Sequence, residues 1–260
     1  MKHIARKRFG QNFLIDTSII DRIITGINPQ KNENLVEIGP GLGALTCPLL
    51  SIAGKLDVIE LDRDIIPKLN RNCGDRGELI IHNQDVLSFD FSSLATDHKK
   101  LRIIGNLPYN ISTPIIFHLV KFGHIIQDMH FMLQKEVVNR LAAQPGTSSY
   151  GRLSVMTQYH FRVAPLFLVP PESFDPQPKV DSSIVMLKPH QHPPVSVTDE
   201  AAFSALVKQA FAMKRKTLRN TLKSLCTVQQ LETTGINPSQ RAEEITIKQF
   251  ADLSNLLSTS

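Results

Sequence analysis

The stretch NLPYNIS at 106–112 follows an apolar run and combines an amide, a proline and an aromatic ring. The exocyclic amine of adenine is a poor nucleophile because its lone pair is delocalised into the ring. Two hydrogen-bond acceptors that take both N–H groups would free that lone pair for an electrophile, and their dipoles would stabilise the charge that develops on nitrogen. Asn106 offers a side-chain oxygen and Leu107 a peptide oxygen. Pro108 fixes φ, and Tyr109 offers a ring on which a base can stack. An ordinary turn is the competing interpretation.

The turn EIGPGLGA at 37–44 is a second candidate site. Its glycines let the backbone approach a ligand closely, and Gly39 begins a match to the dinucleotide fingerprint. Glu37, however, lies inside the turn, where a carboxylate would repel a pyrophosphate and could help to hold a cationic ligand. Glu60 and Asp85 end the next two apolar runs, although Asp85 is equally well explained as a cap. Acidic groups with few nearby cations suit S-adenosylmethionine, whose sulfonium and ammonium groups are positive.

Alternating apolar runs and helix-compatible segments would position these residues. Strands are predicted at residues 35–38, 56–60, 79–82, 101–104 and 129–133, with later ones at 160–163 and 183–187. Helices are predicted at residues 44–53, 63–72, 112–122 and 135–143. This alternation predicts an α/β fold, a Rossmann-like parallel sheet with helices on both faces. The polar residues then meet at the edge of the sheet where open α/β folds bind ligands.

The stretch KPHQHPP at 188–194 is typical of a linker. We expect residues 1–188 to form the catalytic domain with a basic N-terminal arm. We expect residues 189–260 to form a small C-terminal α-helical domain. On a helical wheel, one face of this domain is shared by Val207, Phe211, Leu218, Leu222 and Leu225.

Charge is distributed unevenly along the chain, whose net charge is +5. Residues 1–15 and 201–231 hold ten of the 29 basic residues and none of the 24 acidic residues, so the remainder is mildly acidic. Two basic segments on an acidic body suggest a polyanionic partner, with two solvated faces as the plainer alternative. The residues expected to contact the phosphates of such a partner, which would be RNA if the resemblance described below holds, are Lys208, Arg215, Lys216, Arg219 and Lys223.

Composition excludes several other classes of protein. Hydrophobic residues make up 42% of the 260 residues, which indicates a globular protein. No apolar run approaches the ~20 residues that span a bilayer, and the N-terminus has no signal-peptide pattern, so we expect a cytoplasmic protein without a membrane partner. Cys47, Cys73 and Cys226 are odd in number and far apart in sequence, which fits a reducing compartment and excludes a CxxC site. The histidines form no ligand-spaced cluster, and no metal site is expected.

Five stretches, in order along nearly the whole chain, resemble the ribosomal RNA adenine dimethyltransferase family. They are RFGQNFL at 8–14, EIGPGLG at 37–43, NLPYNIS at 106–112, FDPQPKVDS at 174–182 and FAMKRKTLRNTL at 211–222. The resemblance implies dimethylation at N6 of two adjacent adenines near the 3′ end of 16S rRNA in small-subunit precursors, with a role in late assembly. It implies cofactor contacts at Asn12, Leu14, Gly39, Glu60, Asp85 and Asn106.

The resemblance also suggests a role for Phe174, in the proline-rich loop 170–178. A flipped base needs a second wall opposite Tyr109, and Phe174 is the candidate, with a core phenylalanine as the alternative. A monomer is the default expectation.

Three rival functions remain at this point. One is a related antibiotic-resistance methyltransferase that acts on 23S rRNA, which shares the NLPY motif; the stretch 211–222 favours the small-subunit type. Another is an assembly or transcription factor that has lost turnover, against which the intact NLPY motif argues. The last is a nicotinamide dehydrogenase, which rests only on the glycine turn.

Overall fold

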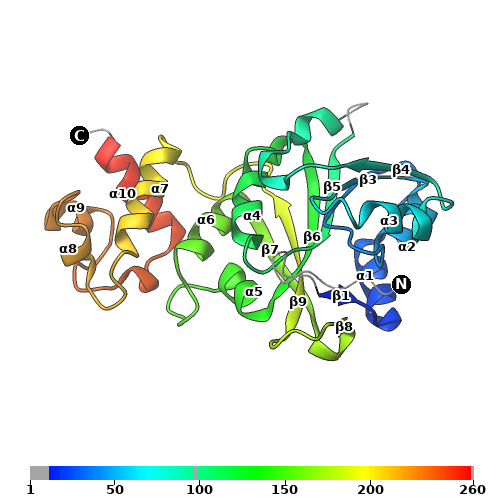
Figure 1. The fold of residues 1–260 in the computed structure, drawn as a ribbon. Coiled ribbons are helices and arrows are strands. Elements are labelled where there is room, and N and C mark those ends of the chain that lie inside the picture. Colours follow the sequence, from blue (N-terminus) through cyan, green and yellow to red (C-terminus); the bar gives the residue numbers. More distant parts are fainter. Residues whose placement is uncertain (1–11, 96–98, 259–260) are drawn as a thin grey trace. The chain divides into compact units, whose positions relative to one another are not determined.

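The computed structural model describes residues 12–95 and 99–258, which divide into two compact units (Figure 1). The first comprises the described residues up to Val138 together with Val163–Pro189. The second comprises Asn139–Arg162 and the described residues from His190 onward. The N-terminal part of the expected basic arm, residues 1–11, lies outside the described residues.

Residues 139–162 group with the C-terminal helices, whereas the sequence analysis assigned them to the catalytic domain. Tyr150 explains the difference, because its buried hydroxyl donates to the Ile245 carbonyl at 3.0 Å and its ring packs edge-on against Phe211. The Gly146 N–H also donates to the Glu243 carbonyl, at 2.7 Å. These contacts join segments about a hundred residues apart, which local sequence patterns do not reveal.

Seven strands form one sheet in the order β4-β3-β2-β5-β6-β9-β7 (Figure 1). Their bounds are β2 (Asn34–Ile38), β3 (Lys55–Ile59), β4 (Glu78–His82), β5 (Leu101–Asn106), β6 (Ile126–Gln134), β7 (Phe161–Val169) and β9 (Ser182–Pro189). The strands from β4 to β6 are parallel, and β9 pairs antiparallel with β6. The α/β fold class is therefore confirmed. The predicted strands were found because central strands covered on both faces are continuously apolar.

Helices connect the parallel strands. They are α2 (Thr46–Ala53), α3 (Ile66–Cys73), α4 (Ser112–Val120) and the short turns η2 (Val86–Ser88), η3 (Phe91–Leu94) and η4 (Gly123–Ile125), with α5 (Lys135–Ala142) after β6. Helix α1 (Thr17–Ile27) was not predicted, although the sequence carries signals for it. Asp16 caps its first turn, and Ile23 and Ile27 are buried with a helical spacing of four.

A separate two-stranded sheet joins distant segments of the first unit. It pairs β1 (Phe13–Leu14) with β8 (Phe174–Asp175), which follows the short turn η5 (Pro171–Ser173). Leu14 and Phe174 are partners in this sheet and belong to the same buried core cluster. The segment just before α1 is therefore held beside the loop that precedes β9.

Cys47 in α2 and Cys73 in α3 form a disulfide, which does not agree with the expectation that the cysteines fit a reducing compartment. They are 26 residues apart in sequence, but both helices flank the glycine turn. Gly43 has a φ of +98°, and a Cβ there would meet both sulfur atoms. The side-chain-free position thus lets the turn lie against the disulfide. Cys226 is free.

The C-terminal part of the second unit is helical, as expected. Its elements are α7 (Glu200–Ala210), α8 (Leu218–Thr221), α9 (Val228–Thr233), η6 (Ala242–Glu244) and α10 (Ile247–Ser258), and α6 (Arg152–His160) lies in the same unit. Within residues 12–95 and 99–258, no helix has the length and apolar run that crossing a bilayer requires.

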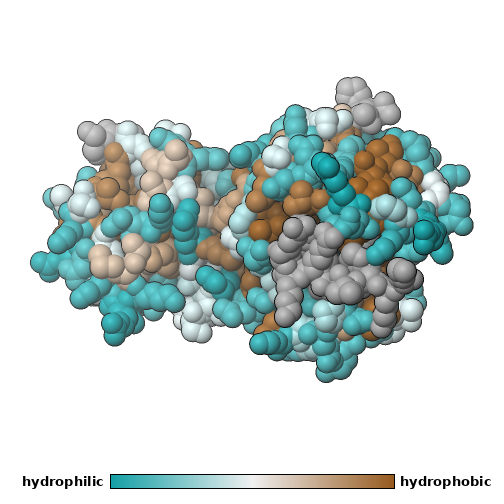
Figure 2. All heavy atoms as spheres, viewed as in Figure 1, coloured by the Kyte–Doolittle hydropathy of each residue, from teal (hydrophilic) through white to brown (hydrophobic). Residues whose placement is uncertain are grey.

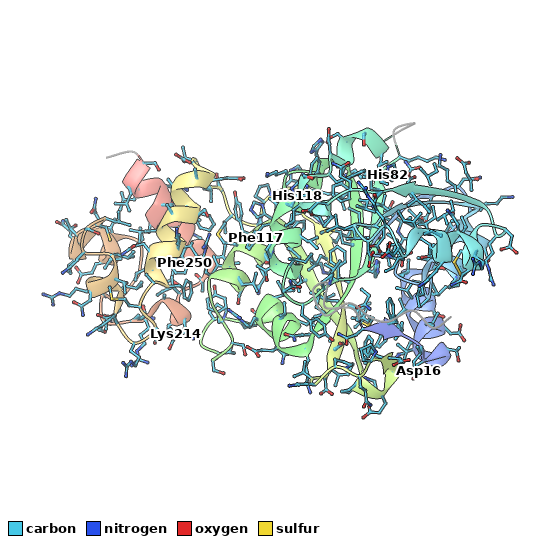
Figure 3. The ribbon with its side chains drawn as sticks, viewed as in Figure 1. Asp16, His82, Phe117, His118, Lys214 and Phe250 are labelled. Atoms are coloured by element: carbon cyan, nitrogen blue, oxygen red, sulfur yellow. A yellow bond between two sulfur atoms is a disulfide. The ribbon has the colours of Figure 1, made fainter. Side chains whose placement is uncertain are left out.

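The wheel drawn through residues 207–225 was wrong in one respect, because the chain leaves the helix between Phe211 and Thr217. The Leu218 N–H donates to the Gln240 carbonyl at 2.8 Å instead of continuing a helix. The Phe211 ring packs against Phe250, which is labelled in Figure 3. Tertiary contacts therefore override the helical pattern. Leu218 is buried, whereas Leu225 is 47% exposed and does not join the buried face.

Candidate functional site

A cavity of about 870 Å³ lies at the carboxyl ends of the parallel strands in the first unit. It brings together every predicted catalytic and cofactor residue except Phe174, namely Asn12, Leu14, Gly39, Glu60, Asp85, Asn106, Leu107, Pro108 and Tyr109. These residues come from four strand ends and from the segment before α1. Parallel strands place their carboxyl ends at one edge of a sheet, which is why residues so far apart in sequence meet.

Asn106 ends β5, and the first of the two expected acceptors is its side-chain oxygen. Its Nδ2 donates to the main-chain carbonyl of Asn12 at 3.1 Å. A carbonyl can only accept, so this bond fixes which end of the amide faces Asn12. In the described part of the chain, Oδ1 of Asn106 receives no hydrogen bond. It is therefore available to a ligand in the cavity.

The second expected acceptor is the main-chain carbonyl of Leu107. The carbonyls that follow it are occupied: Pro108 accepts from the Ile111 N–H at 3.1 Å, and Tyr109 accepts from the Ser112 hydroxyl at 3.3 Å. No described residue donates to the Leu107 carbonyl. The NLPY segment is thus a turn that opens α4, as the plainer interpretation expected, and it also leaves two neighbouring acceptors free at the cavity.

Tyr109 lines the same cavity and is half-buried. Its hydroxyl lies 2.8 Å from the Ser182 Oγ, at the first residue of β9. Burial raises the pKa of Tyr109, and the bond to Ser182 opposes that shift only in part, so the phenol stays neutral. Sequence reasoning missed Ser182 as a partner, although it is the last residue of the quoted stretch FDPQPKVDS.

Two buried carboxylates face the glycine turn. Glu37 is 2% exposed and accepts a hydrogen bond from the Thr46 hydroxyl at 2.6 Å. Burial raises the pKa of Glu37 to about 7, while Thr46 lowers it and the charge of Glu60 raises it further. Burial also raises the pKa of Glu60, against hydrogen bonds from main-chain N–H groups that include those of Asp62, at 2.8 Å, and Gly41.

The direction of the Gly41 N–H separates two of the cofactors that the sequence left open. In a dinucleotide fold the N–H groups of this turn face a pyrophosphate. Here the Gly41 N–H is directed at the carboxylate of Glu60, and Glu37 adds a second acid to the cavity. Arg76 also lines the cavity, but neither Glu37 nor Glu60 forms an ion pair with a residue that the structure describes. Two such carboxylates fit the positive groups and ribose hydroxyls of S-adenosylmethionine.

Asp85 caps η2, because its Oδ1 accepts from the Leu87 N–H at 2.9 Å. Asp85 is therefore a helix cap, as one of the two interpretations of the sequence expected. Asp85 also lines the cavity, and a carboxylate has acceptor capacity beyond one hydrogen bond. Its role as a cofactor ligand stays a prediction.

Phe174 is not brought to the cavity. Its side chain is 3% exposed and packs in the core cluster, which matches the alternative that it is a core residue anchoring a loop. A stacking role for Phe174 stays a prediction. The preceding Ser173 donates from its hydroxyl to Asp16 at 3.2 Å and accepts from the Ile15 N–H at 2.9 Å. Asp16, labelled in Figure 3, therefore ties the cavity-lining segment before α1 to the 173–174 segment.

The expected RNA-contacting residues are all exposed on the second unit. Lys208 lies in α7, Arg215 and Lys216 in the following turn, Arg219 in α8 and Lys223 just after it. Hydrophilic side chains cover the lower part of this unit in Figure 2, where Figure 3 labels Lys214. None of the five forms an ion pair with another described residue. Their positions are compatible with an RNA-contacting surface, but not with one continuous helical stripe.

A metal-binding role has no counterpart among the residues that the structure describes, where no three His, Cys, Asp or Glu side chains converge. Asn72, Arg76 and Gln84 line the cavity and were not singled out in the sequence. Thr46, also not singled out, does not line the cavity but donates to Glu37 from beneath it. Its position directly after the glycine turn, at the start of α2, was the available signal.

The comparisons with known proteins agree on one family. The family model described as ribosomal RNA adenine dimethylase matches residues 2–259. A ribosomal RNA small subunit methyltransferase A from Photobacterium profundum is 54% identical over 255 residues, which cover 98% of this chain and 94% of the relative. A protein of the same name from Hahella chejuensis is 53% identical over 253 residues, which cover 97% of this chain and 93% of the relative.

Solved structures support the same assignment. A dimethyladenosine transferase from Plasmodium falciparum has a TM-score of 0.79 and 27% identity, and the match covers 93% of this chain and 95% of the other. The 23S rRNA methyltransferase ErmE has a TM-score of 0.73 and 23% identity, and the match covers 95% of this chain and 100% of ErmE. At this identity it is evidence for the fold alone. The Rossmann-like fold predicted from the sequence is confirmed, and the chain belongs to the ribosomal RNA adenine dimethylase family.

Proposed function

We propose that this protein methylates N6 of two adjacent adenines near the 3′ end of 16S rRNA, in small-subunit precursors. Family membership gives the reaction class, an S-adenosylmethionine-dependent dimethylation of adenine in ribosomal RNA. The choice of subunit is supported by relatives at 54% and 53% identity that carry the small-subunit name. A 23S rRNA specificity, the alternative, has the weaker support of a structure at 23% identity.

The observation that carries the proposal is the pair of free acceptors at Asn106 and Leu107. Each would take one N–H of the adenine amine, so that the nitrogen lone pair faces the methyl donor as the nitrogen becomes tetrahedral. The two oxygen dipoles are already oriented and stabilise the positive charge that develops on nitrogen. No strong base is needed, because the amine proton becomes acidic only after methyl transfer. Tyr109 would hold the base by stacking on its ring.

The remaining cavity residues would bind the cofactor. When bound, S-adenosylmethionine supplies an electrophilic methyl group on a sulfonium. Glu37, once ionised, favours the positive charges of this ligand, and Glu60 would accept from the ribose hydroxyls. Asp85 would accept from the cofactor's adenine amino group. Asn12 and Leu14 would close the cavity from the segment before α1.

The ribosomal context is proposed on chemical grounds. The exposed cations from Lys208 to Lys223 would bind rRNA phosphates, which position an RNA without reading its sequence. Specificity would then come from RNA shape in a late 30S precursor. With such a substrate the protein would act in the cytoplasm, with a role in late assembly, and a monomer is the simplest state that this mechanism requires.

One experiment separates the candidates. Radiolabelled S-adenosylmethionine is supplied with undermethylated 30S particles or with 50S precursors, and the RNA is digested to nucleosides. The proposal predicts label in dimethyladenosine from 30S RNA. Label found only in 50S RNA supports the 23S alternative. Tight particle binding without transfer means that the chain is a binding protein, and the catalytic proposal then fails.

A further inference from the structure

Tyr109 carries a hydroxyl that its proposed task does not use. A base stacks on the face of an aromatic ring, and a phenylalanine would offer the same face. The hydroxyl of Tyr109 is instead 2.8 Å from the Ser182 Oγ. The contact partner of this hydroxyl is therefore inside the protein, and it joins the turn after β5 to the beginning of β9, across 73 residues of sequence.

Ser182 is held firmly on the sheet. Its side chain is fully buried, and as the first residue of β9 it pairs with Gln134, the last residue of β6. The preceding residue, Asp181, accepts from the Lys135 N–H at 3.0 Å, and the Lys135 ammonium lies 3.1 Å from its carboxylate. The Ser182 hydroxyl is thus attached to a backbone that is fixed on both sides of its own residue.

The backbone of Tyr109, in contrast, belongs to a turn. Its carbonyl accepts from the Ser112 hydroxyl at 3.3 Å, which fixes the main chain but not the ring. The terminal torsion of a tyrosine side chain is broad, so a ring held at Cβ alone can rock about that axis. A hydrogen bond at the opposite end of the ring supplies a second fixed point. The plane of the ring is then defined by both the turn and the sheet.

We propose that Ser182 is a positioning residue for the methyl transfer, which holds the Tyr109 ring at the angle that presents the adenine amine to Asn106 and Leu107. This inference rests on the proposed function, because the base that Ser182 would help to orient is the adenine that stacks on Tyr109. Ser182 touches neither reactant and acts only through the Tyr109 hydroxyl. The loss of the bond should therefore slow methyl transfer more than it weakens the binding of either ligand.

The test compares the single variants Tyr109→Phe and Ser182→Ala with the double variant. Single-turnover rates are measured at saturating S-adenosylmethionine and saturating undermethylated 30S particles. One hydrogen bond corresponds to a fall of about twofold to tenfold. Because both single variants remove the same bond, we expect similar falls and a double variant no slower than the slower single variant. The affinities for both ligands should stay within about twofold of the parent.

Ser183→Ala is the matched control. Ser183 is the next residue of the same strand and is also buried. Its hydroxyl donates to the Phe167 carbonyl at 3.1 Å and forms no hydrogen bond with Tyr109, whose hydroxyl instead pairs with Ser182. Its removal should lower the melting temperature about as much as Ser182→Ala, without changing the rate. Fluorescence of 2-aminopurine at the target position should change in Ser182→Ala and Tyr109→Phe but not in Ser183→Ala.

Two results would overturn the inference while the proposed function stands. In one, the parent methylates adenine but the two single variants slow it additively, or not at all. In the other, Ser183→Ala slows it as much as Ser182→Ala, so that the effect is one of sheet stability. If the parent itself transfers no methyl group to adenine, the proposed function fails first.

Discussion

Buried polar groups at the two edges of the central sheet differ in how completely they are hydrogen-bonded. At the amino edge, Arg102 donates to both oxygens of Asp128, at 3.0 and 3.1 Å, to Glu33 at 2.8 Å and to the Ile27 carbonyl at 2.7 Å. At the carboxyl edge, four residues further along the same strand, Asn106 has a side-chain oxygen that no described residue uses.

The difference in electrostatics follows the difference in bonding. Burial alone would lower the pKa of Arg102, but the hydrogen bonds and charges of Asp128 and Glu33 more than offset this effect. The pKa of Arg102 is therefore raised, and the guanidinium stays protonated. Glu37, at the other edge, has one side-chain donor and a pKa raised to about 7, so its charge responds to its surroundings. Polar groups with all their partners present stabilise the fold, whereas groups left partly unpaired stabilise a ligand.

The largest expected effect is on stability, at the amino edge. Arg102→Met leaves Asp128 and Glu33 buried or half-buried without their cation, so the free energy of unfolding should fall by about 3–5 kcal/mol. Urea titration followed by circular dichroism measures it, since the chain has no tryptophan. The folded fraction should keep a near-parental methylation rate, because the cavity lies at the opposite edge.

The double variant Arg102→Met/Asp128→Leu sharpens the result. It removes the uncompensated charge together with the cation and should regain part of the lost stability. If Arg102→Met instead left the unfolding free energy unchanged, the amino-edge cluster would not have the structural role assigned to it here.

The next effect is a dependence of cofactor affinity on pH. The pKa of Glu37 is about 7 in the folded chain against an ordinary value of 4.5, so the folded state retains this proton between those values. The stability contributed by the neutral group is present below about pH 4.5 and is lost as the pH rises towards 7. The binding of the cationic cofactor should change with pH in the opposite direction to this stability contribution. Its affinity should rise with pH, by up to about tenfold per pH unit below 7.

Calorimetric titration of S-adenosylmethionine between about pH 5.5 and 8.5 measures this dependence. Glu37→Gln keeps the shape of the side chain without its charge and should flatten the curve. A parental curve that is already flat, or a Glu37→Gln variant that keeps the slope, would separate Glu37 from cofactor binding.

The smallest expected effect is on RNA binding by exposed basic residues, and it compares basic residues with and without an ion-pair partner. Lys216 and Arg219 have no ion-pair partner among the described residues, whereas Lys248 pairs with Asp252 at 2.6 Å in the same unit. In Lys216→Ala/Arg219→Ala, binding to 30S particles should weaken and its salt dependence should become shallower, by about one unit of log–log slope per lost phosphate contact. Lys248→Ala is the control and should leave the slope unchanged. Equal slopes in all three proteins would remove these two residues from the RNA surface.

Local patterns predicted the parts of this molecule that depend on neighbours in sequence. The apolar runs of β2 to β6 and the polar residues that end them could be recognised because a parallel sheet buries both faces of its strands. The Cys47–Cys73 disulfide, the break after Phe211 and the pairing of β1 with β8 could not, because each depends on contacts between distant segments. The pairing of Tyr109 with Ser182 belongs to the same class.

The single-turnover rate of Asn106→Ala tests the central claim most directly. With Leu107 left as the sole acceptor, methyl transfer to adenine in undermethylated 30S particles should slow by about 10²–10³-fold. The melting temperature should stay close to that of the parent, in contrast to Arg102→Met. A rate within about twofold of the parent would contradict the claim that the free side-chain oxygen at the end of β5 holds the reacting amine.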